Sequence, residues 1–144
     1  MIANIDGGAR GNPGESGFGV YVQDDLGREI ASLYGYLGHQ TNNVAEYAAL
    51  LAALRYATDQ GVSRLKIRSD SELLVRQING QYRVKNPMLR KLHQAALSLM
   101  RRCGRVTVEH VRREQNRDAD RLANEAMDTR HDDPPGIAQG LLEV

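Results

Sequence analysis

The sequence lacks the residues that would crosslink the chain or anchor it in a membrane. Its 144 residues include one cysteine, four prolines and no tryptophan. A single cysteine excludes an intrachain disulfide and favours a reducing compartment, which we expect to be the cytoplasm. No stretch approaches 18 consecutive apolar residues and no basic and apolar leader precedes the first motif, so neither membrane spanning nor secretion is expected. With 41% hydrophobic and 26% charged residues, the composition predicts a globular chain with one core.

Net charge is also nearly absent, because 19 basic residues balance 18 acidic ones. This balance excludes a polycation that binds nucleic acid through bulk charge alone. The charges are nevertheless unevenly distributed. Residues 1–63 hold 3 basic and 7 acidic residues, residues 64–127 hold 15 and 7, and residues 128–144 hold 1 and 4. The second half of the domain is therefore expected to present a basic surface.

Alternating apolar residues predict three strands near the start of the chain, at residues 2–8, 17–23 and 28–36. The turn sequence at 24–27 joins the last two of them. Antiparallel strands can be joined by such short connections, whereas parallel strands cannot. The first part of the chain is thus predicted to be an antiparallel meander.

Helical spacing dominates the remainder of the chain. Helices are predicted at 43–59, 71–79, 88–103 and 119–127, with strands at 64–69 and 105–111. Strands separated by helices pair in parallel through right-handed crossovers, so we predict an α/β domain with a mixed sheet over residues 1–130. Residues 131–144 contain two prolines, two glycines and no periodicity, which predicts a flexible C-terminal tail.

Acidic residues occupy positions where burial of a charge would be costly. Asp6 lies within the first strand, Glu46 heads the apolar stripe of the first helix and Asp70 follows the fourth strand. Each also has an ordinary interpretation, Asp6 as a turn residue and the other two in capping patterns, with Asn43 as the cap before Glu46. Residues that follow parallel strands line the crevice where ligands bind, which favours a functional role for Asp70.

The last predicted helix offers two further acids, Asp118 and Asp120. They flank its apolar stripe on opposite sides, so helical geometry alone does not choose between them. Both also have the ordinary role of an acid near the positive end of the helix dipole.

Four motifs in order carry a resemblance to a known family. They are the glycine-rich run Asp6–Gly14, Thr41–Glu46 (TNNVAE), Ser69–Ser71 (SDS) and Asn116–Ala123 (NRDADRLA). On these motifs the chain from Ile2 to about Met127 resembles the type 1 ribonuclease H family. The resemblance implies a ribonuclease H-like fold with five strands, three antiparallel and then two parallel, and endonucleolytic hydrolysis of the RNA strand of RNA/DNA hybrids.

The resemblance identifies the catalytic, metal-binding carboxylates as Asp6, Glu46, Asp70 and Asp120, and so selects Asp120 over Asp118. Converging carboxylates repel one another unless cations neutralise them, and hard oxygen ligands suit Mg²⁺ or Mn²⁺. Two ions per site would clamp the scissile phosphate, one activating water and one stabilising the leaving 3′ oxygen. The products would carry 5′-phosphate and 3′-hydroxyl ends.

The resemblance also assigns residues to the two strands of the substrate. The residues that match contacts to the RNA strand, whose 2′-hydroxyl distinguishes it from DNA, are Glu46, Gly7, Gly8, Asn12 and Asn42. The residues that match contacts to the DNA strand are Thr41, Asn43, Asn86 and His39. His39 replaces the family's usual Arg, and a neutral imidazole binds phosphate more weakly, so this contact would depend on pH.

Two segments depart from the family pattern. Many members insert a Lys- and Trp-rich helix, the basic protrusion, where this chain has only residues 81–86. Hybrid affinity would then be weaker, or would depend on Arg83, Lys85, Arg90 and Tyr82. Double-stranded RNA becomes a further expected substrate. Many members also carry a His in a loop before the last helix. Here we predict Arg113 as the auxiliary catalytic group, with a solvated surface arginine as the alternative.

The leading hypothesis is a metal-dependent ribonuclease H that acts as a monomer on RNA/DNA hybrids, without a membrane partner. A non-catalytic module that binds hybrid or double-stranded RNA is one alternative, which the intact set of four acids disfavours. A nuclease of similar fold with another substrate, as in junction resolvases and transposases, is the second. The glycine-rich run and the TNN sequence favour hybrid recognition over this second alternative.

Overall fold

A five-stranded sheet with the order β3-β2-β1-β4-β5 forms the centre of the computed structural model, which describes residues 1–144. Its strands are β1 (Ile2–Arg10), β2 (Gly14–Gln23), β3 (Glu29–Gln40), β4 (Arg64–Ser69) and β5 (Arg105–His110). β1, β2 and β3 pair antiparallel, whereas β4 pairs parallel with both β1 and β5. The prediction of three antiparallel strands followed by two parallel ones is confirmed.

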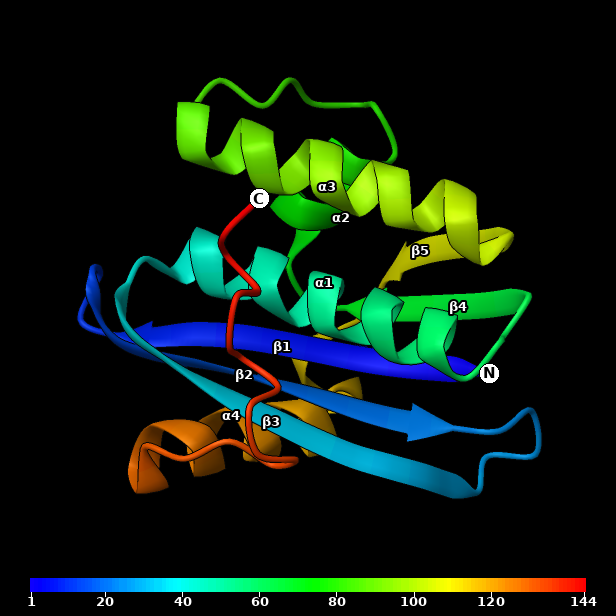
Figure 1. Ribbon diagram of the computed structural model, residues 1–144, viewed down its shortest axis with the longest axis horizontal. Coiled ribbons are helices and arrows are strands. Elements are labelled where there is room, and N and C mark those ends of the chain that lie inside the picture. The colour runs from blue at the N-terminus through cyan, green and yellow to red at the C-terminus, as the bar shows by residue number, and fades with distance from the viewer.

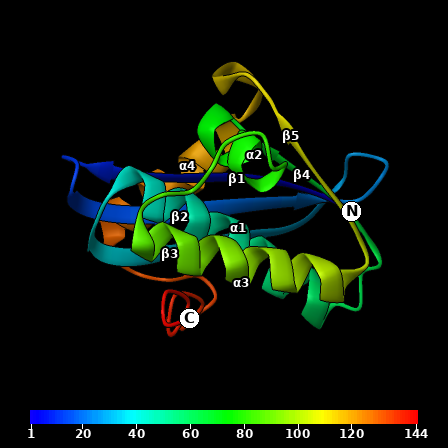
Figure 2. The same ribbon diagram turned by 90° about the horizontal axis from the view of Figure 1, so that it is seen from above.

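Helices cover both faces of the sheet (Figure 1). They are α1 (Asn42–Asp59), α2 (Glu72–Ile78), α3 (Pro87–Cys103) and α4 (Arg117–Thr129). α1 lies on one face and α4 on the other, and α3 runs alongside α1 farther from the sheet (Figures 1 and 2). Because α1 is enclosed by the sheet and α3, 11 of its 18 residues are buried, in contrast to a one-sided amphipathic helix. No helix is long and apolar enough to cross a membrane.

The first two strands extend farther through the glycine-rich run than alternation predicts. β1 continues to Arg10 and β2 begins at Gly14, and their pairing is unbroken from Ile2 opposite Gln23 to Arg10 opposite Glu15. Glycine has a low strand propensity, but continuous pairing with the neighbouring strand overrides it here. The run Asp6–Gly14 is therefore a β-hairpin that projects beyond the parallel part of the sheet.

The helix caps differ from those that the sequence pattern predicts. Thr41, and not Asn43, caps α1, since its hydroxyl oxygen accepts from the Val44 amide at 3.2 Å. Ser71 caps α2 in the same way, accepting from Leu74 at 3.2 Å. The hydroxyl oxygens of Thr41 and Ser71 thus fill the capping roles, and the carboxylates of Glu46 and Asp70 remain available for other contacts.

Residues 131–144 pack against the domain, which differs from the expectation of a flexible tail. They pass from the end of α4 around the β3 edge of the sheet toward α1 (Figure 1). Asp133 forms an antiparallel bridge with Tyr34, and the Asp132 carboxylate accepts from the Tyr36 amide at 2.9 Å. Leu141 is fully buried in the core. An edge strand has unpaired backbone groups and this segment pairs with them, a long-range contact that carries no local periodicity.

Candidate active site

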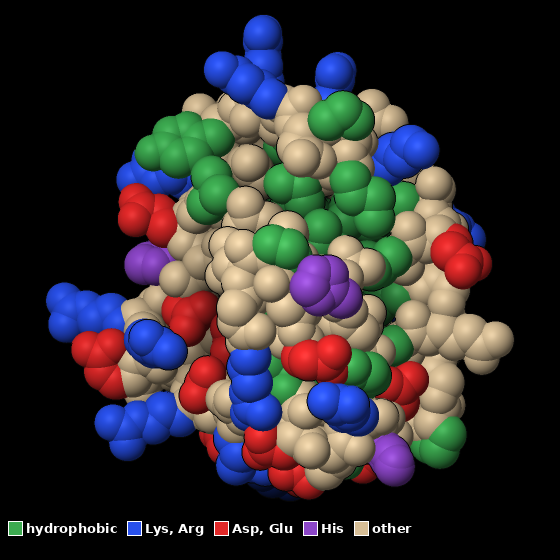
Figure 3. Space-filling model, turned by 90° about the vertical axis from the view of Figure 1, so that its left-hand side faces the viewer, with side chains coloured by type: hydrophobic (Ala, Val, Ile, Leu, Met, Phe, Trp, Pro, Cys, Tyr) green, Lys and Arg blue, Asp and Glu red, His purple; other side chains and the backbone are tan.

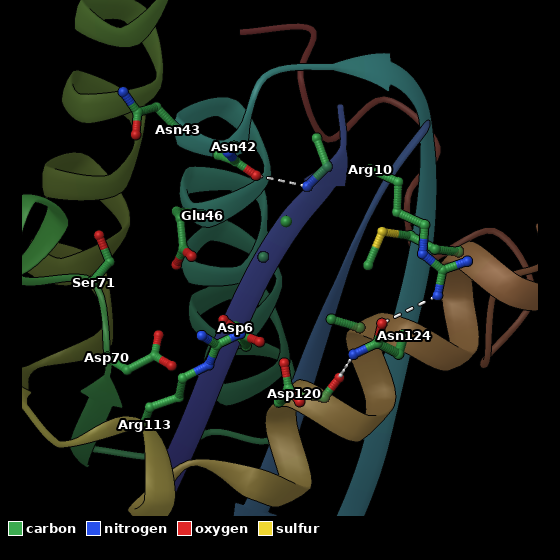
Figure 4. A pocket seen from close by; sticks show the side chains of 15 residues that line it. Asp6, Arg10, Asn42, Asn43, Glu46, Asp70, Ser71, Arg113, Asp120 and Asn124 are labelled. Atoms are coloured by element: carbon green, nitrogen blue, oxygen red, sulfur yellow. Dashed lines mark hydrogen bonds between the residues drawn. The ribbon is translucent and has the colours of Figure 1, made fainter. Parts of the chain in front are cut away.

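Four carboxylates from four separate elements line one open cavity of about 530 Å³ (Figure 4). Asp6 comes from β1, Glu46 from α1, Asp70 from the residue after β4 and Asp120 from the first turn of α4. Ligand oxygens of Asp6, Glu46 and Asp70 all lie within 4.8 Å of one another. The structure therefore brings together the acids that the motifs single out.

Sheet register opens the space in which these acids meet. β1 and β4 pair in parallel only from Ile2 opposite Lys66 to Ile5 opposite Ser69. The next residue on each strand is Asp6 or Asp70, so both acids lie where the parallel pairing ends. Carboxyl ends of parallel strands are the usual place for a ligand crevice, and the cavity occupies this position.

Two glycines let helices approach Asp6 from opposite faces of the sheet. A Cβ on Gly7 would lie 2.2 Å from the Ala45 carbonyl oxygen at the start of α1. A Cβ on Gly19, which pairs with Asp6 across the sheet, would lie 2.4 Å from the Ala119 carbonyl oxygen of α4. These backbone contacts permit no side chain, so both glycines are required for Glu46 and Asp120 to reach the cavity.

The structure separates Asp120 from Asp118, which helical geometry could not do. Asp120 lines the cavity, whereas Asp118 is exposed and lies 3.6 Å from the Arg121 guanidinium, away from the cavity lining. The buried Asn116 fixes the start of α4, since its amide donates to the Ile5 carbonyl at 2.9 Å and accepts from Asn4 at 3.2 Å. β1 and α4 are thereby joined directly beneath the carboxylates.

Burial and mutual repulsion raise the pKa values of three acids in the cavity. Burial is the largest cause at Asp6, where the charges of Asp70 and Asp120 add to it, and together they raise its pKa to about 8. Burial raises the pKa of Glu46 well above its usual value, and its Oε2 atom is buried without a hydrogen-bond partner. Burial also raises the pKa of Asp70, although the Asn116 amide and Arg113 oppose that rise.

This set of side chains fits a hard cation. The carboxylates are all oxygen donors, none of them forms a salt bridge in the protein, and the Glu46 Oε2 atom is buried without a partner. Oxygen ligands at such spacing can hold a divalent ion, which would remove the repulsion that raises their pKa values. Arg113, on the single-turn helix Arg113–Gln115, also lines the cavity and its guanidinium points toward Asp6 and Asp70 (Figure 4).

The predicted substrate-contacting residues divide into two groups. The residues that line the cavity are Gly7, Gly8, Asn42 and Asn43. The residues that lie outside its lining are Asn12, Thr41, Asn86 and His39. Asn12 is joined to the first group because its Oδ1 accepts from the Asn42 amide at 3.0 Å. His39 is exposed near the end of β3, opposite Glu15.

The cavity also contains residues that the sequence patterns did not identify as functional, namely Arg10, Ser71, Ala123, Asn124 and Met127. Ala123 and Met127 were expected in the apolar stripe of the last helix, and both are buried. Asn124 lies one helical turn after Asp120, so its spacing could have revealed it. Arg10 belongs to the glycine-rich run, but its side-chain direction depends on the hairpin.

The segment that stands in place of a basic protrusion is a short connection between α2 and α3. It spans residues 79–86, and the Arg76 guanidinium lies over the Tyr82 ring at 5.3 Å. Figure 3 views the end of the molecule where the β1–β2 hairpin and the starts of α1 and α3 lie. Lys and Arg side chains project around its rim, and most carboxylates lie in its lower half.

Comparison with known proteins identifies relatives of the whole domain. A family model described as reverse transcriptase-like matches residues 4–126. A bifunctional protein of Mycobacterium tuberculosis (strain H37Rv) is 42% identical over 129 residues, which cover 89% of this chain and 35% of the relative. Ribonuclease HI of Halobacterium salinarum is 39% identical over 126 residues, covering 88% of this chain and 63% of that protein.

Solved structures extend this relationship to three dimensions. LC11-RNase H1, isolated from compost and crystallised in complex with an RNA/DNA hybrid, aligns with a TM-score of 0.85 at 41% identity. The alignment covers 90% of this chain and 97% of LC11-RNase H1, whereas the chain spans only about a third of the length of the mycobacterial relative. Because the fold and the sequence agree over nearly the whole of the crystallised LC11-RNase H1 chain, this protein belongs to the type 1 ribonuclease H family.

Proposed function

We propose that the protein is an endoribonuclease that hydrolyses the RNA strand of RNA/DNA hybrids. The observation that carries the proposal is the convergence of Asp6, Glu46, Asp70 and Asp120 in one open cavity beside the start of α1. Four buried or half-buried acids that form no salt bridge destabilise a fold, so their presence favours a ligand that needs them. LC11-RNase H1, at 41% identity, was crystallised with such a hybrid.

The four carboxylates would hold Mg²⁺ or Mn²⁺, two ions per site when substrate is bound. When bound, such ions supply an activated water and stabilise the charge that develops on the leaving oxygen. The protein's own contribution is to hold the carboxylates rigidly through the β1–β4 register and through Asn116. Water would add to phosphorus as the bond to the 3′ oxygen breaks, leaving 5′-phosphate and 3′-hydroxyl ends.

Arg113 is proposed as an auxiliary group for the same reaction. Its guanidinium points into the cavity near Asp6 and Asp70 (Figure 4). It is an exposed residue of a short helical turn, so it can follow a phosphate that enters or leaves the site. A permanent positive charge at this place would stabilise the anionic product before release.

Hydrogen bonds within the protein occupy the side-chain oxygens of Asn12 and Asn42 but leave their NH₂ groups free to donate. The Asn42 oxygen accepts from the Ala9 amide at 2.8 Å, and the Asn12 oxygen accepts from the Asn42 amide. The acceptor atoms are thus occupied, while each side-chain NH₂ is unpaired. Free donors suit phosphate oxygens and the oxygen of a 2′-hydroxyl, which supports contact of Asn12 and Asn42 with RNA. Backbone groups of Gly7 and Gly8, with the Glu46 carboxylate, would complete the RNA side.

The same reasoning applies to the DNA side of the proposed site. The Thr41 oxygen accepts from Val44 and the Asn86 oxygen accepts from Leu89, each as a helix cap. The Thr41 O–H and the Asn86 NH₂ remain free to donate to a phosphate. His39 and the exposed Asn43 would complete this side, in a monomer that acts in the cytoplasm.

Cleavage of labelled duplexes tests the proposal. RNA/DNA, RNA/RNA and DNA/DNA duplexes are incubated with Mg²⁺, Mn²⁺ or chelator, using the unaltered protein and Asp70→Asn. We expect metal-dependent cleavage of the hybrid with 5′-phosphate ends, weaker cleavage of RNA/RNA and none of DNA/DNA. Cleavage that survives chelation or Asp70→Asn would overturn the metal assignment. Equal cleavage of DNA/DNA would overturn recognition of the 2′-hydroxyl.

A further inference from the structure

The cavity continues past the carboxylates along α4. Asp120, Ala123, Asn124 and Met127 all line it, at helical spacings of three, four and seven residues. Seven residues of helix correspond to about 10 Å. This α4 arm, bounded on its other side by Arg10, is longer than a site for one phosphate requires, since each strand of a duplex carries a charge about every 3.4 Å along the axis.

Arg10 is held at the far end of the α4 arm by two contacts. Its Nη2 lies 2.6 Å from the Asp128 carboxylate and donates to the Asn124 side-chain oxygen at 3.1 Å. Asn124 is itself oriented, because its NH₂ donates to the Asp120 backbone carbonyl at 3.0 Å. Figure 4 shows the resulting chain of contacts from Asp120 through Asn124 to the Arg10 guanidinium.

Both protein contacts of Arg10 use the same terminal nitrogen. The Nε and Nη1 atoms have no partner in the protein, and the side chain is 48% exposed. A guanidinium presents its donors as a planar fork that matches the oxygens of a phosphate. Ala123 and Met127 contribute apolar atoms to the lining of the same arm, which suit a sugar rather than a charge.

We infer that the α4 arm is a second subsite, which binds the nucleotide next to the scissile phosphate on the RNA strand through Arg10. The inference rests on the proposed hydrolysis of hybrids. The strand is the RNA strand because the arm is continuous with the carboxylates that would receive the scissile bond. Asn124 is a positioning residue, which aims Arg10 without touching the substrate.

Neutral phosphate analogues test the subsite directly. A series of hybrids carries one methylphosphonate at each position near a single cleavage site, on the RNA or the DNA strand. With the unaltered protein, we expect neutralisation of one phosphate next to the scissile one to raise KM about tenfold, the loss of one charged contact. With Arg10→Ala, KM for the unmodified hybrid rises by a similar factor, and the methylphosphonate at that position causes no further loss.

Arg121→Ala is the matched control. Arg121 is an exposed arginine of the same helix that pairs with Asp118 and does not line the cavity. Its replacement removes the same charge, so KM and the pattern of sensitive phosphates should stay unchanged. Binding by Arg10→Ala should also lose about 0.7 to 0.9 from the slope of log affinity against log salt.

A purely structural role for Arg10, as a tie between the hairpin and α4, makes a different prediction. Arg10→Ala would then lower stability and kcat while the unaltered and variant proteins show the same sensitive phosphates. That outcome, or a sensitive phosphate on the DNA strand, would overturn the subsite. Arg10→Lys keeps the charge, so its KM should lie between those of the unaltered protein and Arg10→Ala. If Arg10→Ala does not fold, Arg10→Lys takes its place in the phosphate series.

Asn124→Ala tests the positioning step. It should raise KM less than Arg10→Ala does and leave kcat within about twofold, and in the double variant it should add nothing. An additive effect, or a fall in kcat alone, would show that Asn124 acts through Asp120 instead.

The same experiments distinguish failure of the proposed function from failure of the subsite. If the unaltered protein cleaves no hybrid, the proposed function fails. If it cleaves the hybrid but Arg10→Ala leaves the pattern of sensitive phosphates unchanged, only the subsite fails.

Discussion

The carboxylate cavity and the β3 edge differ in whether their polar groups find partners within the protein. In the cavity, Asp6 and Glu46 are surrounded by like charge, and Glu46 Oε2 has no partner. At the β3 edge, Asp133 pairs with Tyr34 through both backbone groups, and Asp132 accepts from the amides of Tyr36 and Ala138. The cavity leaves electrostatic repulsion for a ligand to relieve, whereas the β3 edge satisfies its own polar groups.

This difference implies that activity and stability reside in separate parts of the molecule. Buried like charges reduce the free energy of unfolding, and proteins commonly accept such a loss at functional sites. Leu141, in contrast, anchors the segment 131–144 in the hydrophobic core, is fully buried there and does not line the cavity. We therefore expect substitutions in the cavity to abolish activity without unfolding the protein, and substitutions at the β3 edge to do the reverse.

The largest expected effect comes from Asp120→Asn. Loss of one proposed metal-binding charge should reduce kcat/KM for hybrid cleavage by about a thousandfold or more, while the free energy of unfolding stays the same or rises. Asp118→Asn is the control, because Asp118 lies two residues earlier on the same helix but pairs with Arg121 outside the cavity. Steady-state cleavage and urea unfolding measure the two quantities. A lower free energy of unfolding in Asp120→Asn would contradict the separation of activity and stability between the cavity and the β3 edge.

Leu141→Ala tests the other side of the comparison. Removing a fully buried leucine should lower the free energy of unfolding by about 2–4 kcal/mol, with a lower melting temperature, because it leaves a cavity in the core. Hybrid cleavage at a temperature where the variant is folded should be unchanged. Deletion of residues 131–144 should likewise retain activity at reduced stability. Leu142→Ala, at a half-buried neighbour, should cost less; an equal cost would argue against specific packing of Leu141.

Metal removal and pH should alter stability through the cavity alone. The folded protein keeps the Asp6 proton up to about pH 8, whereas the unfolded chain releases it near pH 3.8. Between these values the folded state binds more protons, so in chelator the free energy of unfolding falls as pH rises. Mg²⁺ should raise the melting temperature most at the upper end of this range, and Asp6→Asn should flatten the slope. Thermal unfolding in chelator measures this dependence. A free energy of unfolding that rises with pH would contradict repulsion among the buried carboxylates.

The smallest expected effect concerns the exposed basic residues Arg83, Lys85 and Arg90. Lys85→Ala should weaken hybrid binding about threefold at low salt and less at high salt, because an exposed contact to phosphate is screened. Fluorescence anisotropy in the Asp120→Asn background measures binding without cleavage. Lys66→Ala is the control, since Lys66 lies beside Met1 and Arg64 at the opposite end of the sheet. Equal weakening by both would indicate bulk charge instead of a defined surface.

Sequence patterns predicted all five strands and all four α-helices but not the single-turn helix Arg113–Gln115, and they misplaced mainly the ends. Local periodicity predicts which residues alternate or repeat, but it does not reveal that β1 continues to Arg10 or that β2 begins at Gly14. The cap at Thr41 was missed because Asn43 is an equally good capping residue, and only the backbone conformation at Thr41 decides between them. The packing of residues 131–144 was missed for a related reason, since it rests on Tyr34, almost a hundred residues away.

The proposed site shows the same division. The motifs indicated four acids, and the family resemblance chose Asp120 where helical spacing left Asp118 equally possible. The placement of Arg10 and Asn124 in the α4 arm followed only from the structure, because their contact joins residues from β1 and α4. Spacing from Asp120 could have suggested Asn124, but no pattern predicts that its oxygen faces Arg10.

By itself the sequence determined the element order, the mixed sheet and the identity of the motifs, because periodicity and short connections act locally. Only the tertiary structure decided that these acids share one cavity. That convergence requires parallel pairing that stops at Ile5 and Ser69, and backbone contacts at Gly7 and Gly19 that bring α1 and α4 against β1 and β2. Such contacts join residues distant in the chain, and their distances are set by packing rather than by local propensity.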